Sequence, residues 1–283
     1  MENKKTYHTV GVIVQSISIL AKHDFFDRLS YKFSERNCKS LIQTTGGDIE
    51  VERECFKLFS KIADAIVVIS SATDYSEIID VVPVDKPVVF LLTEPEGCDR
   101  TCILESDYSA IYQGIISCSN QGKKKIAFVY SSFDNTYTQE CLRSYKDALA
   151  VIDEKGFDES LLFAVENPHK YDPSILINQI LTAGCDAILT TTPTLTSTLI
   201  DYIIYSSKMY DTSKLLIMGY EPTQSLVSSQ MYVDLIVQPS DEILDLTVQQ
   251  ILFLINHPKI VTDKKRRVYR LKSTLRMHHK TLS

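Results

Sequence analysis

The chain has 283 residues, which is enough for two lobes of ordinary size, each with its own core. Hydrophobic residues make up 44% and charged residues 23%, as in ordinary water-soluble proteins, and no apolar run reaches the roughly 18 residues that a membrane span needs. The net charge is −6, yet nine Lys or Arg stand against one acidic residue after Pro258. No recognition-helix pattern accompanies this basic segment, so we interpret it as a solvated turn and edge strand beside an acidic lobe, with nucleic-acid contact as the alternative.

The predicted elements of the first half alternate between strands and helices. Strands are expected near 9–15, 39–44, 64–70 and 87–92, and helices near 25–36, 49–61 and 75–80. In the helix at 49–61, one apolar stripe is expected to face the core, with the charged residues turned mostly outward. The stripe is Val51, Cys55, Leu58, Phe59 and Ile62, and the charged residues are Glu50, Glu52, Arg53 and Glu54.

The second half repeats the scheme. Strands are expected near 124–130, 160–165, 186–191, 214–219 and 232–237, and helices near 107–120, 137–153, 172–183, 194–206 and after Pro239. Asp172-Pro173 and Thr192-Pro193 are typical helix starts, and Gly156 and Gly184 suit the left-handed end of a helix. Apolar strands without polar alternation, separated by helices, are typical of parallel sheets covered on both faces. The sequence therefore predicts an α/β fold of two Rossmann-like lobes joined by crossovers, with a ligand between them beyond the carboxyl ends of the strands.

The cysteines and the missing motifs narrow the class of protein. Seven cysteines without regular spacing and a start without an apolar signal core predict a reducing, cytoplasmic location. Cys98 and Cys102 are the one close pair, and a metal or redox role there is the less favoured alternative. The sequence contains no G-x-S-x-G, H-E-x-x-H, P-loop or G-x-G-x-x-G motif, and its six histidines are scattered. We expect a protein that is not an enzyme, with no catalytic residue, cofactor or metal.

Nine short motifs, in order and at matching spacing from about residue 6 to 274, resemble one family, the lactose-repressor-type (LacI/GalR) transcription regulators. They are Thr9–Val14, Asp24-Phe25-Phe26, Ala63–Val68, Pro87–Phe90, Ser106-Asp107-Tyr108, Gln121–Phe128, Ser144–Leu149, Met218–Glu221 and Val237-Gln238-Pro239. The resemblance implies a periplasmic-binding-protein-like (type I) fold. The expected lobes are 6–106 with 238–262, and 107–237 with 263–283. It also implies a homodimer, and the helix at 25–36 with Cys38 offers more apolar residues than one core face needs: Phe25, Phe26, Leu29, Phe33 and Cys38.

Regulators of this family bind operator DNA through an N-terminal helix-turn-helix module. The first strand here is expected near residue 9, so we expect that module to be missing and this chain alone not to bind duplex DNA specifically. The resemblance implies that a small effector bound by the lobes would favour one lobe angle over another. The alternatives are a solute-binding protein of a transporter and a regulator core that answers to a protein partner.

The family's sugar-binding positions survive only in part. Cys141 stands where the family has a ligand-gripping arginine, Thr192-Pro193 replaces an Asn-Asp pair, and Glu221 replaces an aspartate. The candidate ligand-binding residues are Ser16, Ser18, Phe25, Phe26, Asp107, Ser131, Asp134, Cys141, Thr192, Glu221 and Gln238. Asp107 has capping of the following helix as its alternative role. With the arginine lost and two carboxylates kept, we expect a sugar, polyol or amine-bearing molecule stacked on Phe25 in preference to a phosphate.

Overall fold

The computed structural model describes residues 7–16, 24–70, 72, 74–76, 78–131, 136–152, 156–167, 170–206, 215–221, 233–262 and 266–277. The chain divides into two compact units. Unit 1 comprises Met1–Glu105 and Pro239–Leu271, and unit 2 comprises Ser106–Gln238 and Lys272–Ser283. The predicted lobes remain a prediction. They place the third limit after residue 262, whereas the division between the compact units falls between Leu271 and Lys272, inside the strand Val268–Lys272.

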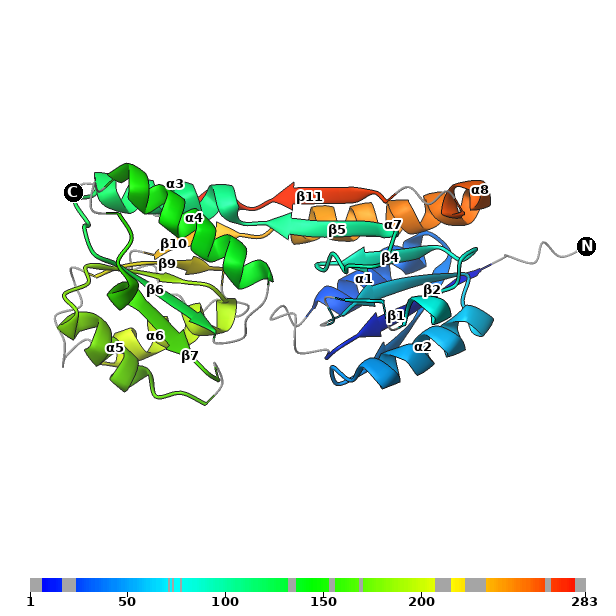
Figure 1. Ribbon diagram of the computed structural model, residues 1–283, viewed down its shortest axis with the longest axis horizontal. Helices are drawn as coiled ribbons and strands as arrows, with labels where there is room; N and C mark the ends of the chain where they lie inside the picture. The colour runs from blue at the N-terminus through cyan, green and yellow to red at the C-terminus, as the bar shows by residue number, and fades with distance from the viewer. Residues whose placement is uncertain are drawn as a thin grey trace, which may run out of the picture. The chain divides into compact units, whose positions relative to one another are not determined.

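Unit 1 is built on one sheet with the strand order β11-β5-β4-β3-β1-β2 in its described part (Figure 1). The strands are β1 (His8–Val14), β2 (Cys38–Thr44), β3 (Ala65–Ile69), β4 (Val88–Leu91), β5 (Thr101–Ser106) and β11 (Val268–Lys272). The pairings from β2 to β5 are parallel. The helices are α1 (Phe25–Glu35), α2 (Ile49–Ile62), the 3-10 helix η2 (Ile79–Val81), α7 (Ser240–Asn256) and α8 (Pro258–Val261).

The central strands of unit 1 are buried on both faces because different helices cover each face. Val12 and Val67 point to the side packed by α1 and α7, where Leu29 and Leu244 meet them. Their neighbours along the strands point to the opposite side, where α2 packs Phe56 and Phe59 among them. This explains why the strands read as continuous apolar runs and not as an alternating pattern.

Unit 2 repeats this plan with the strand order β12-β10-β9-β8-β6-β7 in its described part. The strands are β6 (Ile126–Ser131), β7 (Leu162–Val165), β8 (Ala187–Thr190), β9 (Leu216–Tyr220), β10 (Val233–Val237) and β12 (Thr274–Arg276). Only the β10–β12 pairing is antiparallel within that part of the chain. The helices are α3 (Tyr108–Asn120), α4 (Thr136–Ile152), the 3-10 helix η3 (Glu159–Leu161), α5 (Pro173–Thr182) and α6 (Pro193–Ser206).

The structure confirms the nine predicted strands and most predicted helices to within a few residues. The side chain of Asp172 accepts a hydrogen bond from the backbone N–H of Ser174, so α5 starts at Pro173 as predicted. Gly184 follows α5 with φ of 75°, a left-handed conformation that suits glycine. The segment at 75–80 differs, because its described residues form no α-helix and Ile79–Val81 form a 3-10 turn. The strand β5 and the short helix α8 were not predicted.

The predicted inner face of α2 is right for Cys55 and Phe59 and wrong for its other three residues. Val51, Leu58 and Ile62 are exposed, and the helix instead turns Cys55, Phe56, Phe59 and the carboxyl of Glu52 inward. Compared with the expected orientation, the helix is rotated so that the rings of both Phe56 and Phe59 contact the sheet. Aromatic rings bury more apolar area than the aliphatic side chains that stay outside. The helix therefore carries a buried acid and an exposed apolar stripe.

Candidate functional site

Asp107 lies between β5 and α3, and its side chain is buried. The hydroxyl of Tyr220 donates a 2.7 Å hydrogen bond to Oδ2 of Asp107, and the hydroxyl of Ser273 donates to Oδ1. The alternative role as a helix cap is not seen, because the side chain accepts no N–H from α3. Both carboxyl oxygens are therefore occupied by hydroxyl groups from the same unit.

The electrostatics of this cluster follow from its burial. Burial raises the pKa of Asp107, and hydrogen bonds from Ser273, Tyr220 and Tyr137 lower it in part, while the nearby charge of Glu140 adds to the rise. Burial also raises the pKa of Tyr220 well above its usual range, with the charge of Asp107 as the next cause. The phenol therefore stays protonated and acts as a hydrogen-bond donor.

Cys141 lies on α4 beside the same hydroxyl. Its Sγ is 3.6 Å from the hydroxyl oxygen of Tyr220, and the thiol is buried. Burial raises the pKa of Cys141 strongly, with the charge of Asp107 as the second cause, so the thiol is a weak nucleophile. The structure thus joins two predicted site residues, Asp107 and Cys141, through Tyr220.

The carboxyl end of β8 carries three consecutive threonines. Thr192 accepts the backbone N–H of Leu195 at 3.2 Å, so it caps the start of α6. The hydroxyl of Thr191 is buried and has no hydrogen-bond partner among the described residues. Since nearly all buried hydroxyls in proteins are paired, this unpaired group at a strand end is a candidate ligand contact. Sequence reasoning missed it; three threonines in a row gave no signal to single out the middle one.

Gly219 holds β9 against these threonines. A Cβ atom at this position would lie 2.1 Å from Oγ1 of Thr190 and 2.5 Å from Oγ1 of Thr196. Thr196 in turn accepts the backbone N–H of Tyr220 at 2.9 Å. The glycine therefore permits the close approach that places Tyr220 and Glu221 at the strand end.

Glu221 follows β9 directly and is partly exposed. Its Oε1 lies 2.7 Å from a guanidinium nitrogen of Arg276, in β12. The ligand class expected from the sequence counted the lost arginine and the two carboxylates but not this cation. The basic C-terminal segment supplies the cation by pairing β12 with β10.

The other predicted site residues are more dispersed. Phe25 and Phe26 are 3% and 6% exposed and pack in the core of unit 1. Ser16 and Gln238 are partly buried, Ser131 is buried, and each takes part in interactions of its own. Ser18 and Asp134 lie outside the described residues.

A buried carboxyl also occurs in unit 1. It belongs to Glu52, which was expected to face solvent. The hydroxyl of Ser70, just after β3, donates to Oε2 at 2.8 Å, and the hydroxyl of Tyr75 donates to Oε1. Burial raises the pKa of Glu52 to about 7, partly offset by the hydrogen bond from Ser70. This buried acid lies at the carboxyl end of β3.

The Cys98 and Cys102 pair is buried as free thiols. Burial raises the pKa of Cys98 to about 12 and that of Cys102 to about 11. A metal or redox role needs accessible thiolates, which these positions disfavour. Across the described residues, no cluster of three or more His, Cys, Asp or Glu is placed to hold a metal ion. A search of the same residues finds no helix long and apolar enough to span a membrane.

Comparison with known proteins supports the resemblance seen in the sequence. No family model matches the chain. Over 195 residues it is 27% identical to an HTH-type transcriptional regulator of Lachnoclostridium phytofermentans (strain ATCC 700394 / DSM 18823 / ISDg); this covers 65% of the chain and 57% of that regulator. The chain thus matches little more than half the length of this relative.

Solved structures match over almost the whole chain. The Cra transcriptional dual regulator from Pseudomonas putida, in complex with fructose 1-phosphate, superposes with a TM-score of 0.77 at 18% identity and covers 96% of this chain and 99% of its own. A LacI transcriptional regulator from Lactobacillus brevis gives a TM-score of 0.75 at 15% identity, with 95% and 100% covered. The chain has the two-lobed, periplasmic-binding-protein-like fold of the lactose-repressor-type transcription regulators, and in sequence it resembles an HTH-type transcriptional regulator.

Proposed function

We propose that this chain is the effector-sensing core of a lactose-repressor-type transcription regulator, a cytoplasmic protein that binds a small molecule and is not an enzyme. The fold and the sequence likeness to a helix-turn-helix-type regulator support this class. The observation that carries ligand binding is the buried, unpaired hydroxyl of Thr191 at the carboxyl end of β8. In open α/β sheets, ligands bind beyond this end of the strands.

The proposed effector is a sugar or polyol. Thr191 offers one buried hydroxyl, and the strand end of β9 adds the carboxylate of Glu221 beside the guanidinium of Arg276. Such a set suits a molecule with several hydroxyl groups, because each hydroxyl both donates and accepts hydrogen bonds. The ion pair of Glu221 with Arg276 supplies a cation that the sequence had not indicated, so a sugar phosphate becomes the competing ligand class.

We further propose a homodimer, with operator DNA bound only through a separate N-terminal module. The five apolar residues expected to serve the dimer, Phe25, Phe26, Leu29, Phe33 and Cys38, are all buried in the core of unit 1. Exposed apolar side chains include Tyr31 of α1, Leu41 and Ile42 of the edge strand β2, and Val51, Leu58 and Ile62 of α2, with α1 and α2 on opposite faces of the sheet. We propose that these six residues, here called the β2-edge patch, take part in the association of two copies.

A second candidate, a regulator core that answers to a protein partner, has one observation in its favour. Asp107 is satisfied by Tyr220 and Ser273, and Cys141 lacks the donors of the arginine it replaces. Asp107 and Cys141 are therefore less suited to bind a small ligand than the family's residues at these positions.

A thermal-shift screen separates the two candidates. The intact chain is heated with millimolar neutral sugars and polyols, cellobiose among them, and with fructose 1-phosphate. A neutral sugar that gives the largest rise in Tm supports the proposal. A larger rise with fructose 1-phosphate overturns the ligand class but keeps a sensing core. No rise with any member of the panel favours the protein-partner candidate.

A further inference from the structure

The chain passes between its two units at three places: Glu105–Ser106, Gln238–Pro239 and Leu271–Lys272. Two of these crossings lie in neighbouring strands, because β5 and β11 are hydrogen-bonded neighbours in the sheet of unit 1. The backbone N–H of Cys102 in β5 donates to the carbonyl of Arg267 at 2.8 Å. The two crossings therefore form a ribbon, here defined as 101–106 with 267–273.

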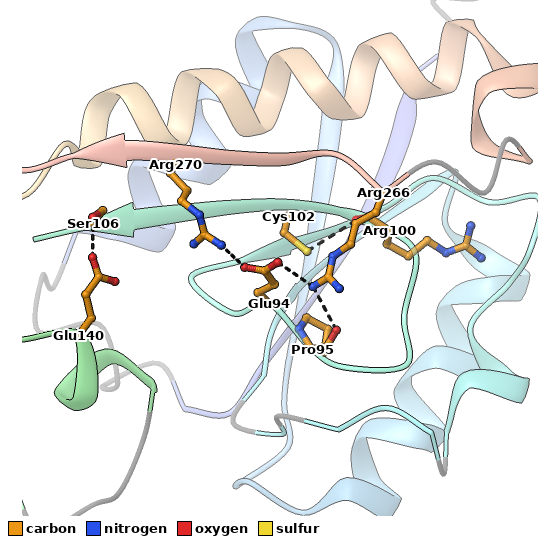
Figure 2. Close-up of polar contacts among 8 residues, drawn as sticks. All are labelled: Glu94, Pro95, Arg100, Cys102, Ser106, Glu140, Arg266 and Arg270. Atoms are coloured by element: carbon orange, nitrogen blue, oxygen red, sulfur yellow. Dashed lines mark hydrogen bonds and ion pairs between the residues drawn. The ribbon is translucent and has the colours of Figure 1, made fainter. Parts of the chain in front are cut away.

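A carboxylate fastens the unit 1 end of the ribbon. Glu94, in the loop before β5, lies 3.1 Å from the guanidinium of Arg266 and also pairs with Arg270 (Figure 2). Arg266 donates a further hydrogen bond to the carbonyl of Pro95 at 3.3 Å. The side chains of Glu94 and Arg266 are 31% and 30% exposed, so water screens this contact less than an ordinary surface pair.

A second carboxylate fastens the unit 2 end. The backbone N–H of Ser273 donates to the carbonyl of Ser106 at 3.0 Å, and its hydroxyl donates to Asp107, which also accepts from Tyr220. The hydroxyl of Ser106 donates to Glu140 of α4 at 2.5 Å (Figure 2). Both crossing chains are thus bound to the body of unit 2 within two residues of the division.

We propose that Glu94 and Asp107 are positioning residues that clamp β5 and β11 into one mechanical element, so that the two crossings respond together to a change in either unit. Each clamp lies inside one unit, and the chain itself is the covalent path from one to the other. Tyr220 extends the path, because it links Asp107 to the end of β9. The inference does not depend on the proposed ligand class, since it concerns only the chain's own contacts.

The clamped ribbon makes a prediction that two independent local contacts do not. If the ribbon opens as one unit, weakening one clamp lowers the free energy of opening at both ends. The backbone amide of Cys102 reports the unit 1 end, and that of Ser273 reports the unit 2 end. The amide of Thr191, which donates to the carbonyl of Val129 at 3.0 Å, reports the interior of unit 2.

The test is native-state hydrogen exchange of the intact chain with residue resolution. Glu94→Gln is expected to speed exchange of the distant Ser273 amide by about fivefold, the effect of losing about one hydrogen bond, with the Thr191 amide unchanged. Asp80→Asn is the matched control, because Asp80 pairs with Arg53 at 2.7 Å in the same unit but away from the ribbon. Tyr220→Phe is expected to speed exchange at Cys102, and Tyr145→Phe serves as its buried control.

Acceleration at the far end in both variants, and in neither control, supports the clamped ribbon. Acceleration confined to the mutated end shows two independent contacts and overturns the proposal. Equal acceleration at all three reporters reflects general destabilisation and also overturns it. If Tyr220→Phe does not fold, the partly exposed Glu94→Gln variant alone decides between these outcomes.

Discussion

The hydroxyl of Tyr220 at the end of β9 donates a 2.7 Å hydrogen bond to Oδ2 of Asp107 at the start of unit 2, a residue 113 positions earlier in the sequence. Both side chains are buried, and Cys141 lies against the same hydroxyl. Where the resemblance implies an arginine reaching toward a ligand, this chain has a small thiol and a phenol that satisfies the carboxyl internally. The hydrogen bond therefore contributes to the stability of unit 2.

Tyr220→Phe is expected to lower the free energy of unfolding by about 1.5–3 kcal/mol, because it removes one donor from a buried carboxyl. Tyr145→Phe is the matched control: its hydroxyl is equally buried and donates 2.7 Å to the carbonyl of Ile126. It should cost only about 1 kcal/mol, since the acceptor is neutral. Urea unfolding of both variants checks this difference. An equal loss in the two variants would argue against a charged Asp107.

Glu52 predicts a pH dependence. Burial raises its pKa in the folded chain from near 4.5 to about 7, so folding favours the protonated form. Its contribution is complete below pH 4.5 and is lost as the pH rises to about 7. The total change is about 3 kcal/mol at 1.36 kcal/mol per pKa unit.

Glu52→Gln keeps the shape and cannot ionise. The free energy of unfolding of the variant minus that of the wild type should therefore rise between pH 4.5 and 7 and stay level above it. Urea titrations of both proteins across this range measure the difference. The contributions of the other carboxylates cancel in it because they are the same in the variant and the wild type. Asp80→Asn, which removes a carboxyl on the surface of the same unit, is the control variant. A difference that is flat across the range would mean that folding does not raise the pKa of Glu52.

The β2-edge patch predicts the surface of the dimer. Leu58 is 48% exposed on α2, and Leu58→Glu should convert the dimer into a species of about half the mass by placing a charge in an apolar contact. Val151→Glu is the control, since Val151 is 68% exposed on α4 outside the patch. Light scattering at micromolar concentration measures both. A wild-type mass equal to that of one chain would contradict the proposed dimer. If Leu58→Glu were still a dimer, the interface would lie elsewhere.

Substitution by valine is expected to affect stability differently at two threonines of unit 2. Thr191→Val removes a buried hydroxyl without a partner, so stability should be unchanged or slightly higher. Thr196→Val removes a hydroxyl that contacts Thr190 at 2.7 Å and accepts the N–H of Tyr220, and it should cost about 1–3 kcal/mol. Thermal unfolding of the two variants compares them. A loss in Thr191→Val as large as in Thr196→Val would show that the Thr191 hydroxyl has a partner.

Much of the fold could be predicted because the strands are buried on both faces and therefore appear as short apolar runs such as Val10–Val14. The strand β5 was missed because its six residues include polar ends, and its pairing with β11 depends on a segment far along the chain. The inner face of α2 was assigned only in part because two apolar stripes overlap on that helix. The buried stripe also contains Glu52, a charged residue that was expected to face outward.

The candidate site was less predictable than the fold. Asp107 and Glu221 were identified by motif, but their partners, Ser273 and Arg276, come from the C-terminal segment and meet them only after β12 pairs with β10. The orphan hydroxyl of Thr191 likewise depends on what surrounds it and not on the local sequence. Local patterns therefore located the strand ends, and tertiary pairing decided which side chains remain available there.

The central claim is that a hydroxylated small molecule binds at the carboxyl ends of the unit 2 strands. The most direct measurement is calorimetric titration of wild type, Thr191→Val and Thr196→Ser with the neutral sugar that gives the largest thermal shift. The account predicts binding to the wild type, roughly tenfold weaker binding to Thr191→Val for one lost hydrogen bond, and little change in Thr196→Ser, which keeps its hydroxyl. Equal affinity of Thr191→Val and wild type, or no neutral sugar that binds at all, would contradict it.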